Sequence, residues 1–135
     1  MSQLVCPKCR ALLNPVVYAE IEVDRCPDCG GIWFDAQEAE DLKTIKGSES
    51  LDAGNPEIGE QFNEMEEDTP CPRCNVSLRG MLDIDRYSIW YEQCPQCRGM
   101  WLDAGEFKQF RQNFRPKTWR DRVKKFFRWK KKRSR

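Results

Sequence analysis

Eight cysteines, arranged as four Cys-x2-Cys pairs, are the residues of this sequence best suited to chemistry. Sixteen residues separate the first pair from the second, and nineteen separate the third from the fourth. Such spacings are typical of paired metal-binding knuckles, and thiolates are ligands that a tetrahedral zinc ion prefers. We therefore expect two bound Zn²⁺ ions, one held by Cys6, Cys9, Cys26 and Cys29 and the other by Cys71, Cys74, Cys94 and Cys97.

Other uses of paired cysteines compete with this interpretation. Disulfides or unpaired buried thiols are one alternative. Cys-Pro-x-Cys also resembles the dithiol of thioredoxin-like proteins, although the surrounding α/β domain that such proteins need is not evident. A rubredoxin-like iron site, and with it electron transfer, is compatible with the same four thiolates.

A site with four thiolate ligands has no open coordination position for water, so we expect both metals to be structural rather than hydrolytic. The chain contains no His, which is the commonest general base, and no Gly-x-Ser-x-Gly nucleophile motif. These features predict a binding module without a small-molecule substrate, and not an enzyme.

Apolar residues are sparse, since 39% of the 135 residues are hydrophobic and 33% are charged. A unit of about 40 residues rarely buries enough apolar surface to fold unaided and relies on a staple such as a metal. No apolar run approaches the roughly 18 residues of a membrane span, and residues 1–5 lack the features of a signal peptide. We expect a cytoplasmic protein, in which paired cysteines bind metal instead of forming disulfides.

The elements that must position the cysteines occur twice. Residues 26–38 align without gaps to residues 94–106, with eight of thirteen positions identical. Alternation of apolar and polar residues between the knuckles predicts a short hairpin in each copy. Asp35 with Glu38, and Asp103 with Glu106, fit a capping box at a helix start. Each helix then has an apolar face, formed by Ala39, Leu42 and Ile45 in one copy and by Phe107, Phe110 and Phe114 in the other.

Recurring residues outside the cysteine pairs have structural explanations. Gly31 and Gly99 permit a backbone turn after the knuckle, and Trp33 and Trp101 are suited to covering a small core beside the metal. The basic residues near the knuckles, which include Lys8 and Arg73, could offset the charge of the thiolates or contact phosphate, and the sequence leaves both uses open.

The chain resembles the transcription factor IIB-type zinc-ribbon family, whose pattern is CPxC, a leucine, a hairpin and then CPxCGGxWLDxGE. The resemblance covers residues 4–46 and 69–110. The first copy keeps the double glycine but has Gln37 in place of the later one, whereas the second has Arg98 in place of the first glycine and keeps Gly105. The resemblance implies the ribbon fold and zinc binding, and it only suggests a role in transcription.

Together these observations predict a small metal-stabilised α+β protein with four parts. Residues 1–46 would form the first zinc ribbon and its capping helix, which Gly47 would end, and residues 47–69 an acidic flexible linker. Residues 70–114 would form the second ribbon and capping helix, and residues 115–135 a basic amphipathic helix. The linker predicts that the two ribbons are not rigidly fixed to each other.

The final segment, residues 115–135, has twelve Lys or Arg residues against one Asp, interleaved with aromatic residues. Such a segment suits nucleic acid, where cations neutralise phosphates and aromatic rings stack on bases. It also suits an anionic membrane surface, or packing on the chain's own second helix or acidic linker. The residues expected to contact a partner are Arg115, Lys117, Trp119, Arg120, Lys124, Lys125, Arg128, Trp129, Lys130, Lys131, Lys132 and Arg133.

The resulting hypothesis is a tandem zinc-ribbon adaptor that binds nucleic acid or the transcription or translation machinery through its ribbon surfaces and basic tail. A membrane-surface or protein–protein scaffold anchored by the tail is the alternative, and an electron-transfer protein with iron is a further one.

Overall fold

The computed structural model describes residues 3–65, 68–113 and 125–128. The first ribbon consists of three strands and a short helix, namely β1 (Asn14–Tyr18), β2 (Ile21–Arg25), β3 (Ile32–Phe34) and α1 (Glu38–Lys43). The second ribbon repeats this order with β4 (Arg79–Ile84), β5 (Ser88–Gln93), β6 (Met100–Leu102) and α3 (Glu106–Gln112). The predicted hairpins are present, and each gains a third strand that periodicity did not indicate.

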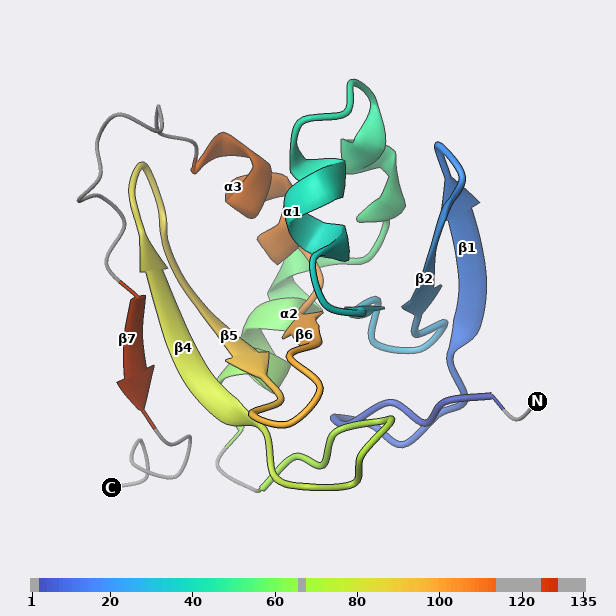
Figure 1. Cartoon of the computed structure of the whole chain (residues 1–135), viewed down its shortest axis with the longest axis vertical. Coiled ribbons are helices and arrows are strands. Elements are labelled where there is room, and N and C mark those ends of the chain that lie inside the picture. Colours follow the sequence, from blue (N-terminus) through green and yellow to red (C-terminus); the bar gives the residue numbers. More distant parts are fainter. Residues whose placement is uncertain (1–2, 66–67, 114–124, 129–135) are drawn as a thin grey trace.

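The strands of both ribbons form one antiparallel sheet in the order β1-β2-β3-β6-β5-β4-β7, where β7 is Lys125–Arg128 (Figure 1). The ribbons join through β3 and β6, whose register places Trp33 opposite Trp101. The repeat therefore folds as two similar halves about a central strand pair, and the expectation of two independent ribbons is wrong. Three-residue strands are too short to show a period, so alternation of residues did not indicate this junction.

At the junction, each ribbon packs a tryptophan against a glycine of the other. A Cβ atom added to Gly31 would collide with the ring of Trp101, and one added to Gly99 would collide with the ring of Trp33. Both indoles are fully buried. The two glycines are needed for this close approach. The left-handed residues after the knuckles are instead Gly30 and Arg98, so the expectation that Gly31 and Gly99 serve the turn is wrong.

Two apolar clusters lie on either side of this junction. One is formed by strand residues and the helices α1 and α3, in which the Phe34 and Phe107 rings lie 5.1 Å apart across the two ribbons. The predicted helix-face residues Ala39, Leu42, Phe107 and Phe110 belong to it, whereas Phe114 lies outside the described residues. The other contains the two tryptophans and cysteines of both ribbons.

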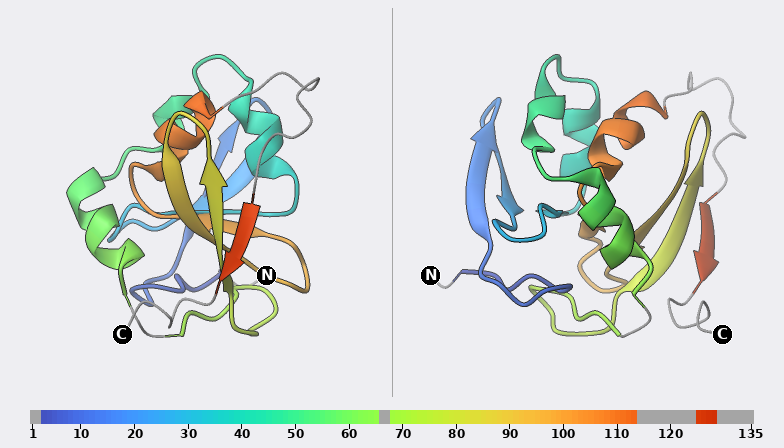
Figure 2. Two further views of the ribbon diagram at one scale, coloured as in Figure 1. Left: turned by 90° about the vertical axis from the view of Figure 1, so that its left-hand side faces the viewer. Right: turned by 180° about the vertical axis from the view of Figure 1, so that it is seen from behind.

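The segment predicted to be a flexible linker is instead folded between the ribbons. It contains the 3₁₀ helix η1 (Ser48–Leu51) and the helix α2 (Pro56–Asn63), which lies in front of the ribbon junction in the rear view of Figure 2. Asn55 caps α2, because its side chain accepts a hydrogen bond from the Glu57 N–H. The composition of this segment favoured disorder. Its short helices are nevertheless ordered, because they pack on the second ribbon.

Asp52 is the residue of this segment that ties it most clearly to the second ribbon. Its carboxylate accepts hydrogen bonds from the backbone N–H groups of Gly105 (2.8 Å) and Lys108 (3.0 Å). These groups belong to the start of α3, where a carboxylate is favoured by the unpaired N–H groups and the helix dipole. Helix α3 is thus capped by a residue more than 50 positions away in the sequence.

Two other predicted features differ from the structure. Gly47 does not end α1, whose last residue is Lys43, but precedes η1 with φ of 87°. Of the segment expected to be a basic helix, the structure describes only Lys125–Arg128, which form β7 and pair antiparallel with β4. The rest of that segment lies outside the described residues. No helix among the described residues is long and apolar enough to cross a membrane.

Replacing Gly99 with Ala tests whether the interlocked tryptophans hold the two ribbons together. We expect the added methyl group to displace Trp33 and to lower the free energy of unfolding by about 1–3 kcal/mol. Denaturant unfolding of the metal-loaded protein measures this loss. Gln96→Ala, at an exposed position of the same knuckle, is the control, and equal stability of the two variants would contradict the assigned contact.

Candidate metal centres

The eight cysteines form two separate clusters of four thiols. Within each cluster the Sγ atoms all lie within 4.8 Å of one another, and the two groups are Cys6, Cys9, Cys26 and Cys29, and Cys71, Cys74, Cys94 and Cys97. The structure therefore brings together the four cysteines predicted for each site. Each cluster combines one knuckle that precedes a hairpin with one that follows it.

The distances between sulfur atoms fit a metal ion and not disulfides. The Sγ atoms of Cys6 and Cys29, and likewise those of Cys71 and Cys97, are 3.8 Å apart. Four thiolates around a zinc ion at about 2.3 Å are separated by about 3.8 Å, whereas a disulfide measures about 2.05 Å. All eight cysteines lie in the described part of the chain, and each is an unbonded thiol.

Backbone amides support one sulfur in every knuckle. The Sγ of Cys6 accepts hydrogen bonds from the N–H groups of Lys8 and Cys9, both at 3.3 Å. The first cysteine of each other knuckle accepts the same two bonds at 3.2–3.4 Å, and these residues are Cys26, Cys71 and Cys94. Hydrogen bonds of this kind favour the thiolate, which is the form that binds metal.

The thiols of one cluster cannot all ionise without a cation. In the first cluster, the hydrogen bond between Cys6 and Cys29 lowers the pKa of Cys6 to about 6, whereas burial raises the pKa of Cys9 to about 12. In the second cluster, burial likewise raises the pKa of Cys71 to about 12. Thiolates this close repel one another, so a bound cation is what allows four of them to be charged together.

The motif Glu residues make the contact expected of them in a capping box, whereas the motif Asp residues do not. The Trp33 and Trp101 Nε1–H groups donate to the carboxylates of Asp35 (3.1 Å) and Asp103 (2.9 Å). The Glu38 and Glu106 carboxylates do accept the N–H of the aspartate three residues earlier, at 2.9 and 2.8 Å. Half of the predicted box is therefore formed, while the aspartates orient the buried indoles. Helices α1 and α3 follow Gln37 and Gly105, which lack a side-chain cap of their own.

The basic residue inside the first knuckle of each ribbon pairs with the opposite ribbon. Lys8 Nζ donates to both Oδ atoms of Asp103 at 2.9 and 3.1 Å, and Arg73 Nη2 donates to Asp35 at 2.9 Å. Each cation also lies near a second carboxylate, Glu92 at 3.4 Å for Lys8 and Asp24 at 3.9 Å for Arg73. The sequence suggested that these cations offset thiolate charge or contact phosphate, whereas the structure pairs both with motif aspartates.

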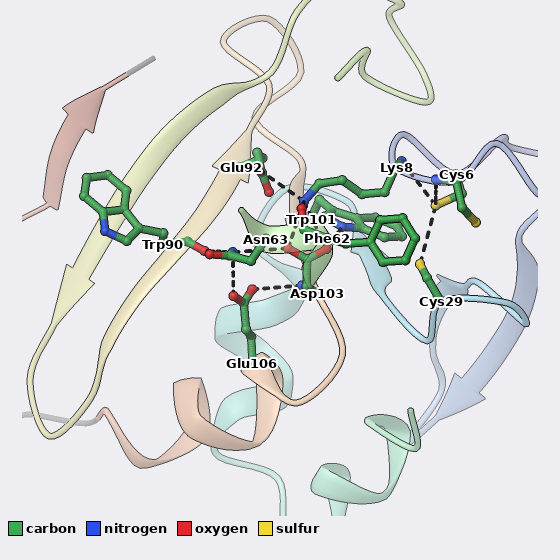
Figure 3. A network of polar contacts seen from close by, with 11 residues as sticks. Cys6, Lys8, Cys29, Phe62, Asn63, Trp90, Glu92, Trp101, Asp103 and Glu106 are labelled. Carbon is green, nitrogen blue, oxygen red and sulfur yellow. Dashed lines mark hydrogen bonds and ion pairs between the residues drawn. The ribbon is translucent and has the colours of Figure 1, made fainter. Parts of the chain in front are cut away.

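The two pairs differ in burial because α2 covers only one of them. The Lys8 and Asp103 side chains are 0% and 1% exposed, whereas those of Arg73 and Asp35 are 44% and 36% exposed. Helix α2 closes the buried cluster: the Phe62 carbonyl accepts from Lys8 Nζ at 2.9 Å, and Asn63 Nδ2 donates to Glu106 at 2.7 Å (Figure 3).

The buried cluster holds three carboxylates against one ammonium group. Burial alone would lower the pKa of Lys8, but Glu92 and Asp103 outweigh it and raise that pKa above its ordinary value. Burial and the neighbouring carboxylates of Asp103 and Glu92 raise the pKa of Glu106 well above that of an exposed glutamate. Lys8 therefore remains charged at the centre of the cluster, where it offsets the repulsion among the acids.

Contacts of the α2 segment account for the two places where the copies depart from the family pattern. A Cβ atom on Gly30 would lie 2.7 Å from the Gly54 Cα, and one on Gly105 would lie 2.8 Å from the Pro56 side chain. The equivalent positions, Arg98 and Gln37, are exposed and have the same left-handed backbone, with φ of 67° and 76°. Of these four positions, glycine occurs only at the two where α2 and the turn before it come close to the ribbon backbone.

Most of the predicted partner-binding residues lie outside the described part of the chain. Lys125 and Arg128 are in β7, where their backbones pair with Asp83 and Gly80 of β4. The others are not described, namely Arg115, Lys117, Trp119, Arg120, Lys124, Trp129, Lys130, Lys131, Lys132 and Arg133. The buried cluster around Lys8 was not predicted from the sequence. The recurrence of a basic residue inside the first knuckle of both ribbons was the one pattern that could have indicated it.

Lys8→Met and Arg73→Met form a matched pair of variants at equivalent positions of the two ribbons. We expect Lys8→Met to lower the free energy of unfolding by about 3–5 kcal/mol, because it leaves buried carboxylates without their cation. Arg73→Met should cost about 1 kcal/mol or less, since its ion pair is exposed. Chemical denaturation of both metal-loaded variants measures the difference, and similar losses would contradict the assigned roles.

The comparison with protein families gives a match over both ribbons. The model of the transcription factor zinc-finger family, a zinc ribbon of the transcription factor IIB type, matches residues 5–45 and 70–112. No curated protein and no solved structure matches the chain. Because the matched segments cover more than half of the sequence, the chain belongs to the transcription factor zinc-finger family and contains two tandem copies of its zinc-ribbon domain.

Proposed function

We propose that this protein is a zinc-binding adaptor that attaches to nucleic acid, or to the transcription or translation machinery, through its basic tail and ribbon surfaces. It acts in the cytoplasm and is not an enzyme. The observation that carries the proposal is the combination of two closed four-thiol sites with a terminal segment of twelve basic residues and one acid. The metal sites provide a rigid body, and the tail provides electrostatic attraction.

Zinc is the ion that fits the donor set best. Four thiolates in a tetrahedral arrangement leave no position for water, and such sites are structural. Iron in a rubredoxin-like site needs the same ligands, but the family to which both ribbons belong is a zinc-ribbon family. Closed sites and the absence of His from the chain also support a function without catalysis.

The tail is favoured as a nucleic-acid contact over a membrane contact. Binding to a lipid interface by a basic amphipathic segment needs a helix with one apolar face. The tail residues that the structure describes form the strand β7 on the edge of the second ribbon. Phosphate attraction and base stacking have no such requirement for a helix, and membership of a transcription factor zinc-finger family points the same way.

The identity of the metal is tested by elemental analysis of the full chain purified without added metal. We expect two zinc atoms per chain, a colourless sample and no iron, because a tetrahedral d¹⁰ ion has no visible absorption. Native mass spectrometry gives the stoichiometry independently. A coloured sample that contains iron would support electron transfer instead, and oxidised thiols without metal would contradict both.

The nucleic-acid proposal is tested by the salt dependence of binding. Fluorescence anisotropy of the full chain with a labelled single-stranded oligonucleotide should give an affinity that falls steeply as salt increases. Replacement of Lys130, Lys131 and Lys132 by Gln should weaken binding and make the slope of log K against log salt shallower by about 2, at about 0.7 per lost phosphate contact.

Lys46→Gln with Lys108→Gln is the comparison variant, since both side chains are exposed on the folded ribbons. Because the tail carries twelve basic residues against one acid, we expect this variant to change the slope by less than the tail variant does. Absence of binding at low ionic strength, or equal slopes for both variants, would contradict the assignment to the tail. Co-sedimentation with anionic vesicles without any affinity for the oligonucleotide would favour the membrane scaffold.

A further inference from the structure

The first knuckle of each ribbon carries a cation that pairs with the opposite ribbon. Lys8 lies between the ligands Cys6 and Cys9, and its Nζ reaches Asp103 at 2.9 Å. Arg73 lies between Cys71 and Cys74, and its guanidinium pairs with Asp35. The position of each cation therefore depends on the fold of its own knuckle, while its ion pair stabilises the other ribbon.

The second knuckle of each ribbon makes the same connection with apolar atoms. Gly31 follows Cys29 by two residues and forms a wall against the Trp101 ring, and Gly99 follows Cys97 by two residues and forms a wall against Trp33. Both tryptophans pack in one cluster with cysteines from both sites. Each knuckle thus shapes the surface on which the other ribbon's indole lies.

We propose that the two metal sites are coupled through this junction, so that binding at one site raises the affinity of the other. A first knuckle without its ion would no longer hold Lys8 or Arg73 in place, and a second knuckle without its ion would no longer fix the glycine wall. The opposite ribbon would then lose the contacts that position its own thiols. Because coupling between binding sites is reciprocal, each site strengthens the other by the same factor.

Helix α2 adds a third connection to this coupling. The Lys8 ammonium group donates to the carbonyl of Phe62, and α2 in turn contacts the second ribbon through Asn63 and Glu106. Loss of the first metal would release Lys8, and with it one fixed point of α2. The junction, helix α2 and both metal sites therefore fold and unfold together. This coupling does not depend on whether nucleic acid is bound.

Zinc titration of the full-length reduced apoprotein, followed by native mass spectrometry, tests the coupling. When half of all sites are filled, two equal and independent sites leave half of the molecules with one ion. Independent sites of unequal affinity leave a larger fraction with one ion. Tenfold coupling reduces this fraction to about a quarter. We expect a quarter or less, and a singly loaded fraction of half or more would overturn the proposal.

Variants that spare all eight cysteines show whether the junction carries the coupling. Trp33→Phe should raise the singly loaded fraction toward half, because the smaller ring leaves the Gly99 wall and loses the bond to Asp35. Trp90→Phe, in β5 and outside the two-tryptophan cluster, is the matched control and should leave the fraction unchanged. A variant that only destabilises the fold would weaken both zinc affinities without increasing the singly loaded species, and that result for Trp33→Phe would also overturn the proposal.

Discussion

Packing of each motif tryptophan against a glycine of the other ribbon is the contact on which the rest of this structure depends. A ribbon of about 40 residues buries only a small fraction of its surface with its own atoms. Here the opposite ribbon supplies the missing wall, and both Trp33 and Trp101 become fully buried. The strands β3 and β6 are brought together by the same contact, so a single sheet crosses the boundary between the two repeats.

Charge is distributed so that this junction can be buried. Each motif aspartate accepts from the tryptophan two residues before it and from a cation of the opposite ribbon, as Asp103 does from Trp101 and Lys8. A buried carboxylate is tolerated only when its lone pairs are satisfied and its charge is offset. The basic residue within the knuckle meets that need at a position that the neighbouring metal ligands hold in place.

The repeat is symmetric at the junction and asymmetric where α2 lies. Helix α2 covers the cluster around Lys8 but leaves the equivalent cluster around Arg73 partly exposed. Gly30 and Gly105 lie against the α2 segment, whereas their counterparts Arg98 and Gln37 have longer, exposed side chains. One duplicated sequence thus presents two different surfaces, a closed one beside the second ribbon and an open one beside the first.

The local features of this protein could be predicted from its sequence. Cysteine spacing indicated two four-cysteine sites, alternation indicated the hairpins, and the apolar residues Leu42 and Phe110 indicated helices, because ligand sets, pleats and helix faces are determined by residues close in sequence.

Only the tertiary structure decided how the parts combine. The β3–β6 junction depends on two three-residue strands, the cap of α3 comes from Asp52, and the partners of Lys8 lie on the other repeat. Segment 47–69 reads as a linker because its apolar residues are few, yet glycines at its contacts let it approach the ribbons closely. Such contacts join residues far apart in sequence, and neither composition nor periodicity carries information about which distant surfaces are complementary.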